Sequence, residues 1–387
     1  MDAFAPPCTL RQISGVSATK PDTERKPEGK GQQPEIYPLT GVRAVAALWV
    51  VFYHLGEEFA KHHPAIFPYL YPFIVKGFLG VDLFFILSGF IIFYNYAERM
   101  RPLRWRAYGE FLWLRLARLW PVHLVMLVLF AIAIGIAYHV HRPPVTPGFY
   151  TVGAFIQNLF LVHNWAIPAE VSWNVPAWSI SCEWFAYLLF PLIVLSRLSS
   201  ASARTAIVVA VGALLAEDAL CEWVGAQGDA KYGILRILGE FTSGAALCRL
   251  YRLGAGRNLP WNVLIPAAIG AEVVTSYWLL PAWGLCPYWA VPFLALIVFG
   301  LSFGRCATSR LLSTRVFLFG GYISYSLYMV HELCNIMLTR SNWTWPLLQV
   351  TVMIAAATAM YYIVEEPCRR AMRRMLRRRQ QPEAMVA

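Results

Sequence analysis

The sequence contains few charged residues: only 14% of its 387 positions are Asp, Glu, Lys or Arg, compared with roughly 25% in soluble globular domains. The hydrophobic class makes up 58% of the chain, and many of these residues fall into long uninterrupted runs. This composition excludes a disordered chain and an ordinary soluble enzyme. Runs of about 18 or more apolar residues have the length that a helix needs to cross a bilayer. The sequence therefore predicts an all-α, polytopic membrane protein.

The sequence also lacks the cysteine and histidine patterns that are typical of metal sites. Its eight cysteines are scattered, most of them inside apolar runs, and no CxxC pair occurs. Neither a disulfide framework nor a zinc site is indicated. We expect no metal, and we interpret the cysteines as small buried hydrophobic side chains.

The first 36 residues lack the pattern of a signal peptide. They are polar and rich in Pro, Gly, Lys and Glu, with no apolar core before a small-residue cleavage site. We predict a disordered cytoplasmic extension over residues 1–36, a membrane domain over residues 37–368, and a basic cytoplasmic tail over residues 369–387.

Ten apolar segments are candidate transmembrane helices, which predicts a multi-pass membrane protein. The segments cover residues 38–58, 77–96, 119–139, 178–196, 204–224, 232–250, 261–280, 284–303, 316–338 and 345–366. A shorter apolar stretch over 151–163 predicts an interfacial or re-entrant helix, because it is too short to cross the bilayer.

Positive charge is distributed unevenly between alternate connections of these segments. One set of connections, together with the C-terminal tail, holds 21 Lys and Arg residues, whereas the opposite set holds 5. Cytoplasmic loops carry the excess of Lys and Arg, so we predict both termini in the cytoplasm. The seven arginines after residue 368 indicate contact with anionic lipid, and the net charge of +11 does not indicate nucleic-acid binding.

Ionisable side chains inside the first two segments are candidate functional groups, because burying one in hydrocarbon costs at least ~2.5 kcal/mol. Arg43 and His54 are eleven residues apart and share one face of a helix that turns about 100° per residue. Asp82, at a similar depth in the second segment, is predicted to pair with His54 and to fix its tautomer. A snorkelling arginine, an interfacial histidine and an N-capping aspartate are the structural alternatives.

Two later segments carry polar stripes on otherwise apolar helices. The first stripe consists of Ser179, Glu183 and Tyr187, and the second of Ser324, Tyr328, His331 and Asn335. Under the predicted orientation both stripes lie in the outer half of the membrane. Together with His54 and Asp82 they predict a polar cavity that opens outward and contains Glu183 and His331.

Arg115 and Arg118 lie three residues apart at the predicted cytoplasmic surface. These two arginines could simply anchor the helix at the cytoplasmic surface, where Lys and Arg are enriched. A phosphate site would explain them equally, because the planar guanidinium offers a fixed fork of donors to phosphate oxygens.

Six segments resemble, in order, those of membrane acyltransferase family 3, the bacterial O-acyltransferases that modify surface glycans. The segments are LTGVRAVAALWVVFYH (39–54), GVDLFFILSGF (80–90), RLARLWP (115–121), WSISCEWFAYLLFP (178–191), ISYSLYMVHE (323–332) and YYIVEEP (361–367). They are spread over residues 39–367, so the resemblance covers nearly the whole predicted membrane domain.

The resemblance can be followed residue by residue. The family's Arg-x10-His, RxxR, membrane Glu and YxxH motifs fall on Arg43 and His54, Arg115 and Arg118, Glu183, and Tyr328 and His331. The chain departs from the family pattern at Cys182, Trp184 and Ala186. The doubled acid at the last motif leaves open whether Glu365 or Glu366 is the match.

The resemblance implies ten spans in the inner (plasma) membrane and acyl-CoA, here expected to be acetyl-CoA, as the donor. Arg43, Arg115 and Arg118 would then bind the CoA phosphates from the cytoplasm. His54, oriented by Asp82, would deprotonate a hydroxyl of a surface or exported polysaccharide or glycolipid. Glu183 and His331 would serve as further acid/base or acceptor-positioning groups, and transfer could be direct or pass through an acyl-histidine.

Two other functions remain open at the level of sequence. A proton-coupled transporter or exporter could use the same intramembrane His, Asp and Glu residues as a proton relay, but it would need no CoA. A non-catalytic assembly protein of a polysaccharide export system would depend on neither His54 nor His331. The acyl group, the acceptor and the oligomeric state do not follow from the sequence.

Overall fold

The computed structural model describes residues 33–141, 146–226, 230–279, 281 and 287–384. Over these residues the chain is helical and forms no β-strand, which confirms the predicted all-α class. Five helices are long and apolar enough to cross a membrane by length and composition. The number is six if α1 and α2, which meet at a 65° bend, form one span.

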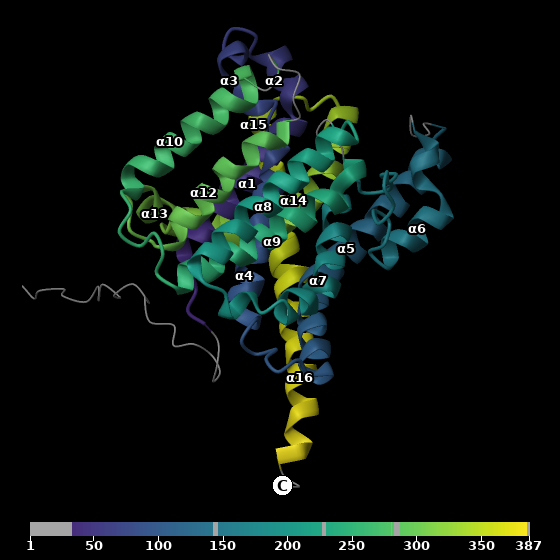
Figure 1. The fold of residues 1–387 in the computed structure, drawn as a ribbon. Helices are drawn as coiled ribbons and strands as arrows, with labels where there is room; N and C mark the ends of the chain where they lie inside the picture. The colour runs from purple at the N-terminus through teal and green to yellow at the C-terminus, as the bar shows by residue number, and fades with distance from the viewer. Residues whose placement is uncertain (1–32, 142–145, 227–229, 280, 282–286, 385–387) are drawn as a thin grey trace, which may run out of the picture. The chain divides into compact units, whose positions relative to one another are not determined.

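The helices follow one another along the chain with short connections. The α-helices are α1 (Tyr37–His54), α2 (Gly56–His62), α3 (Phe67–Ile74), α4 (Leu79–Tyr96), α5 (Trp105–His139), α6 (Val152–Leu159), α7 (Trp178–Leu195), α8 (Ala203–Trp223), α9 (Gly233–Arg252), α10 (Trp261–Val274), α12 (Val291–Ser302), α13 (Ala307–Leu312), α14 (Arg315–Arg340), α15 (Pro346–Met360) and α16 (Glu366–Ala384). Figure 1 shows α1, α4, α8, α9 and α14 gathered in one bundle, with α16 running out of it alongside α5.

A helix lies on each of the ten segments that the sequence predicts to span the membrane, and α6 lies on the shorter stretch over 151–163. One boundary differs in a way that affects function. The long helix α5 begins at Trp105, well before the expected start at residue 119. Arg115 and Arg118 therefore lie inside this helix, and their side chains are held by its packing.

The last predicted segment does not end at its Glu-Glu-Pro sequence, as we expected. A π-helical turn over Tyr361–Glu365 leads directly into α16, so residues 369–384 of the predicted tail are helical. Pro367 does not interrupt the helix. It lies in the first turn of α16, where the missing N–H and the fixed φ of proline are tolerated.

Glycines bring several pairs of helices into backbone contact, among them α4–α9 and α1–α14. A Cβ atom at Gly89 of α4 would lie 2.0 Å from the carbonyl oxygen of Phe241 on α9, and a Cβ at Gly321 of α14 would lie 2.0 Å from the carbonyl oxygen of Thr40 on α1. No residue larger than glycine fits at such an approach. The pairs α4–α9 and α1–α14 are therefore packed as closely as helices allow.

A buried ion pair joins α4 to α9. Nε and Nη2 of Arg236 donate to Oδ1 of Asp82 at 2.9 and 2.6 Å, and these side chains are 1% and 0% exposed. The guanidinium also lies 4.9 Å from the ring centroid of Trp178 and 4.6 Å from that of Tyr288. The predicted pairing of Asp82 with His54 is thus wrong. A permanent guanidinium cation compensates a buried carboxylate better than a neutral imidazole does.

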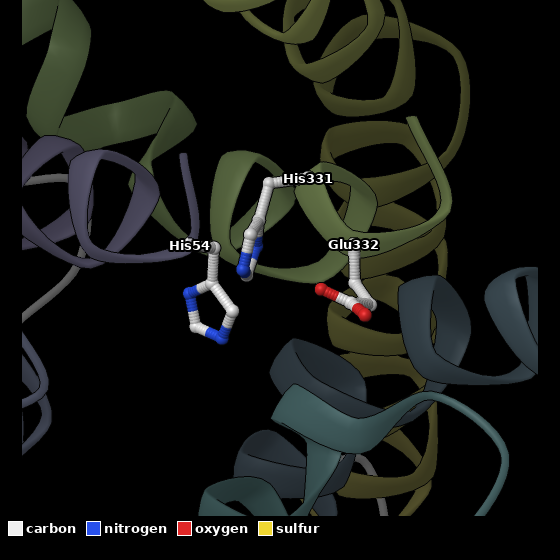
Figure 2. A group of neighbouring side chains, drawn as sticks. All are labelled: His54, His331 and Glu332. Atoms are coloured by element: carbon white, nitrogen blue, oxygen red, sulfur yellow. The ribbon is translucent and has the colours of Figure 1, made fainter. Parts of the chain in front are cut away.

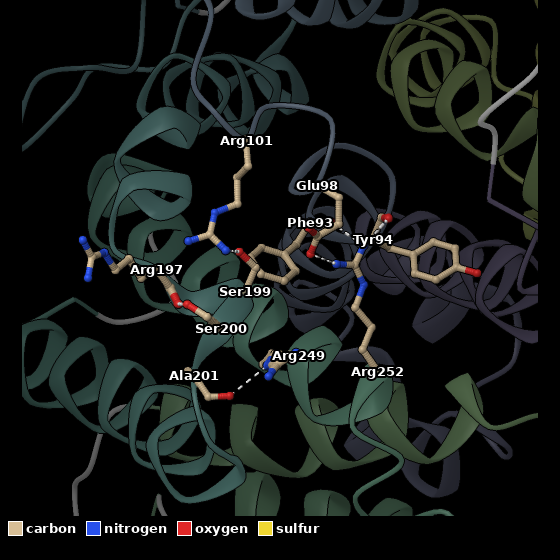
Figure 3. A network of polar contacts seen from close by, with 10 residues as sticks. All are labelled: Phe93, Tyr94, Glu98, Arg101, Arg197, Ser199, Ser200, Ala201, Arg249 and Arg252. Carbon is tan, nitrogen blue, oxygen red and sulfur yellow. Dashed lines mark hydrogen bonds and ion pairs between the residues drawn. The ribbon is translucent and has the colours of Figure 1, made fainter.

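The arginine-rich connections that we assigned to one side of the membrane contact one another, as Figure 3 shows. Arg101, after α4, donates to the hydroxyl of Ser199, after α7, at 2.6 Å. Arg252, at the end of α9, contacts the carboxylate of Glu98 at 2.9 Å. The three connections therefore gather at one end of the bundle.

Connections of the opposite set also meet. The imidazole of His62, at the end of α2, lies 3.2 Å from the hydroxyl of Thr344, before α15. The side-chain amide of Asn164, between α6 and α7, donates to the carbonyl oxygen of Ala230, before α9, at 3.0 Å. Connections assigned to the same side of the membrane are thus neighbours in both sets.

The Asp82–Arg236 pair gives a first testable prediction. Asp82→Asn removes the only carboxylate that hydrogen-bonds Arg236 among the described residues, and breaking one half of a buried ion pair costs about 3–5 kcal/mol. We expect a clear fall in the thermal unfolding temperature of the purified protein in detergent. Glu98→Gln, which removes the exposed partner of Arg252, is the matched control and should change this temperature little. Equal shifts in the two variants would contradict a stabilising role for the buried pair.

Candidate active site

A pocket lies between α1, α4, α5, α7 and α14, and we call it the arginine pocket. The polar groups at its centre are Arg43, Ser88, Arg115, Arg118, Glu183 and Tyr187. The structure thus brings together the three arginines that the sequence suggested for donor binding, although they come from two helices that are far apart in sequence. Apolar residues of α4, among them Phe84 and Ile91, complete the walls.

Glu183 belongs to the arginine pocket. Ser88 donates to its Oε1 at 2.7 Å, and the hydroxyl of Tyr187 donates to the same oxygen. Arg43 and Arg115 both lie within electrostatic range of the carboxylate. The expectation that Glu183 shares a cavity with the histidines is therefore wrong, and the opposite charge of the arginines explains its position.

The guanidinium groups of the pocket are only partly compensated. Arg115 is 8% exposed, donates to the hydroxyl of Tyr96 at 3.0 Å and lies 5.1 Å from the centroid of that ring. The Nε atoms of Arg43 and Arg115 are buried and have no hydrogen-bond partner among the described residues. The carboxylate of Glu365 also interacts electrostatically with Arg43 and Arg118. Three arginines against two carboxylates still leave an excess of positive charge with free donors. Such a site suits an anion with several oxygens.

Tyr328 connects the arginine pocket to a second polar site. Its hydroxyl accepts a hydrogen bond from Ser179 at 2.8 Å and donates to the carbonyl oxygen of Pro176 at 2.8 Å, so the two predicted polar stripes do face each other. The same residue lines the arginine pocket, and its carbonyl oxygen accepts a hydrogen bond from Nδ1 of His331 at 2.7 Å. A single residue thus contacts both sites.

The second site is built around His54 and His331, whose ring centroids lie 4.8 Å apart in an edge-to-face arrangement (Figure 2). Nδ1 of His54 lies 2.9 Å from the carbonyl oxygen of Val50. In the same way, Nδ1 of His331 lies 2.7 Å from the carbonyl oxygen of Tyr328. A carbonyl oxygen can only accept a hydrogen bond, so each Nδ1 carries the hydrogen and each neutral ring leaves Nε2 unprotonated. The backbone therefore fixes the tautomer, which is the task we had assigned to Asp82.

Glu332 completes this site, and we call His54, His331 and Glu332 the histidine group. One donor atom of each lies within 4.8 Å of the others, and Figure 2 shows the carboxylate directed toward the imidazoles. Nε2 of His331 and Oε2 of Glu332 are buried without a hydrogen-bond partner among the described residues. We did not identify Glu332 from the sequence. The sequence feature that indicates it is the pair of adjacent ionisable residues, His331 and Glu332, in an apolar segment.

Two clusters have the residue types that could hold a divalent cation. The histidine group offers two imidazoles and a carboxylate, a donor set that suits Zn²⁺. The other cluster consists of the buried carboxylates of Asp82, Glu217 and Glu240, where Arg236 already supplies a positive charge. Sequence reasoning missed this cluster, although Arg236 and Glu240 are four residues apart and share a helix face.

Together, the two sites provide the parts of a group-transfer reaction. The arginine pocket can hold an anionic donor through its guanidinium groups. The free Nε2 atoms of the histidine group can accept the proton of a nucleophile. Tyr328 lies between them and touches both.

Comparison with known proteins agrees with this chemistry. A family model described as an acyltransferase domain matches residues 36–365, which is most of the chain. No solved structure matches the chain.

Three relatives illustrate the family. The acyltransferase MdmB of Streptomyces mycarofaciens is 31% identical over 157 residues, which are 40% of this chain and 38% of that protein. Protein 2 in the picA locus of Rhizobium radiobacter is 38% identical over 93 residues, which are 24% of this chain and 42% of that protein. The peptidoglycan O-acetyltransferase OatA of Listeria monocytogenes is 28% identical over 195 residues, which are 46% and 28% of the two chains.

Each alignment covers less than half of the relative's own length, whereas the family model extends from α1 to the π-helical turn before α16. It therefore includes the arginine pocket and the histidine group in full. The chain therefore belongs to membrane acyltransferase family 3.

Proposed function

We propose that this protein moves an acyl group from cytoplasmic acyl-CoA to a hydroxyl of a surface or exported polysaccharide or glycolipid. The proposed acyl group is acetyl. The observation that carries the proposal is the position of Tyr328, which joins an anion-binding pocket to a pair of histidines with free Nε2 atoms. Acyl transfer to a hydroxyl needs these two sites side by side, one for the donor and one for the base.

The arginine pocket is the proposed donor site. Its excess of positive charge complements the phosphates of CoA, and Arg115 and Arg118 offer forked donors to phosphate oxygens. Glu183 limits the charge of the pocket and orients Ser88 and Tyr187 through hydrogen bonds. We place this pocket on the cytoplasmic half of a ten-span protein with both termini inside, because the arginine-rich connections gather at one end of the bundle.

The histidine group is the proposed acceptor site, with His54 as general base. His54 is half-buried and is the last residue of α1, so a substrate can reach its ring, whereas His331 is fully buried. Nε2 of His54 takes the hydroxyl proton as the oxygen attacks the thioester carbonyl carbon. The carbon–sulfur bond breaks, and the proton passes to the leaving thiolate. Glu332 stabilises the imidazolium that forms in between.

The proposed acceptor is a glycan because of the relatives. The Listeria monocytogenes protein is named a peptidoglycan O-acetyltransferase, and a saccharide offers hydroxyls of the kind that this base would deprotonate. A multi-pass protein of the inner membrane, with CoA on one side and the acceptor on the other, fits such a reaction.

The membrane orientation can be tested by cysteine labelling. A cysteine in place of His62, at the end of α2, should react with an impermeant thiol reagent added to intact cells. A cysteine in place of Arg106, in the first turn of α5, should react only after the membrane is opened, because we place it on the cytoplasmic side. The unsubstituted protein gives the background of its own cysteines. Labelling of both variants from outside would overturn the orientation.

The donor site can be tested with Arg118→Lys. A compact ammonium keeps the charge but cannot supply the guanidinium fork, so we expect weaker binding of CoA to the purified variant, by roughly tenfold. Arg106→Lys is the matched control on the same helix, because its side chain is 56% exposed. If both variants bind CoA as tightly as the unsubstituted protein, Arg118 serves membrane anchoring instead.

The base can be tested with His54→Ala. A positioned base contributes about 10²–10⁴-fold to rate, so we expect loss of nearly all transfer from labelled acetyl-CoA in membranes, with CoA binding retained. His139→Ala, at the exposed end of α5, is the control. We also expect a metal chelator to leave transfer unchanged, because the proposed base is a free imidazole. Near-normal transfer in His54→Ala together with loss in His331→Ala would assign the base to α14.

A further inference from the structure

The helix α16 is held against α5 next to the arginine pocket. The indole Nε1 of Trp113, on α5, donates to the carbonyl oxygen of Met372, on α16, at 2.9 Å. Trp113 precedes Arg115 by two residues, so this bond fixes α16 beside the part of α5 that lines the pocket. Figure 1 shows the two helices side by side as α16 leaves the bundle.

The arginines at the start of α16 lie on two different faces. Arg369 and Arg373 are one turn apart and share a face, whereas Arg370 and Arg374 share a face rotated by about 100°. Arg369 and Arg370 are both paired with the carboxylate of Glu366. No carboxylate forms an ion pair with Arg373 among the described residues.

The face of α16 that carries Arg369 and Arg373 adds positive charge next to the positively charged arginine pocket. Arg373 interacts electrostatically with Arg369 and Arg115, and more weakly with the carboxylate of Glu366. Within the pocket, Arg43 interacts with Arg118 in the same way. The positive charge of α16 thus interacts with the positive charge of the pocket. Like charges so arranged repel one another, and a bound polyanion would relieve that repulsion.

We propose that Arg373, together with Arg115, binds a phosphate at the nucleotide end of the acyl-CoA donor. This inference rests on the proposed function and extends it to a helix outside the pocket. The acyl-bearing arm of the donor would enter the pocket past Arg118, while the nucleotide stays at the junction of α5 and α16. Arginine suits this position because its fork matches two phosphate oxygens.

The position of Arg373 favours a nucleotide phosphate over a lipid headgroup. A helix that only anchors the protein to anionic lipid would present its arginines away from the bundle. Arg373 is exposed, as Arg374 is, but it interacts electrostatically with Arg115, which is itself buried in the pocket. The face with Arg370 and Arg374 remains the one suited to the membrane surface.

The experiment compares Arg373→Ala with Arg374→Ala, which removes the same charge from the neighbouring face. Full-length protein in nanodiscs of neutral phosphatidylcholine is titrated with CoA and with pantetheine, which lacks the phosphates. We expect Arg373→Ala to weaken CoA binding roughly tenfold, because a hydrogen-bonded charge pair is lost, and to leave pantetheine binding unchanged. Arg374→Ala should bind both ligands as the unsubstituted protein does.

The outcomes separate this inference from the function on which it rests. If the unsubstituted protein does not bind CoA, the proposed donor itself is wrong. If it binds CoA and the two variants weaken binding equally, the effect is one of overall charge and the assignment of Arg373 fails. It fails as well if Arg373→Ala changes binding only when anionic lipid is added to the nanodisc, because the side chain then serves the membrane surface.

Discussion

The cost of placing charge in a low-dielectric interior governs how this chain folds. A buried ion is tolerated when an opposite charge and hydrogen bonds compensate it, and the Asp82–Arg236 pair meets that condition with two hydrogen bonds and two aromatic rings. The pair ties α4 to α9. Because α4 also carries Ser88, the same contact sets the position of the hydroxyl that holds Glu183 in the arginine pocket.

The helices and the polar faces could be predicted from the sequence, whereas the partners of the buried charges could not. Hydropathy runs mark where helices lie, and a 3.6-residue period marks which side chains share a face. Both signals are local, and they placed Ser179 and Tyr328 on stripes that face each other. The partner of Asp82 lies 154 residues away on α9, and no local pattern indicates which helices are neighbours. His54 and Asp82 were at similar depth, but depth does not establish contact.

The histidine group shows how a backbone can replace an acidic side chain. In the familiar arrangement an aspartate holds one imidazole nitrogen and thereby frees the other. Here the carbonyl oxygens of Val50 and Tyr328 hold Nδ1 of the two histidines. The rings are oriented without a second charge at that position. In the proposed reaction Glu332 is thereby left for contact with the reacting groups, and its Oε2 has no hydrogen-bond partner among the described residues.

The glycine contacts have a consequence for motion. With backbone against backbone at Gly89 and at Gly321, the pairs α4–α9 and α1–α14 each behave as a rigid body, because such interfaces cannot slide without a clash. The arginine pocket takes walls from both bodies, with Ser88 on one and Arg43 and Tyr328 on the other. The two bodies are themselves joined by the same kind of contact, because a Cβ atom at Gly80 of α4 would lie 2.7 Å from the carbonyl oxygen of Ala46 on α1. Any opening of the site during turnover is therefore a movement of α5 or α7 against this single stiff wall.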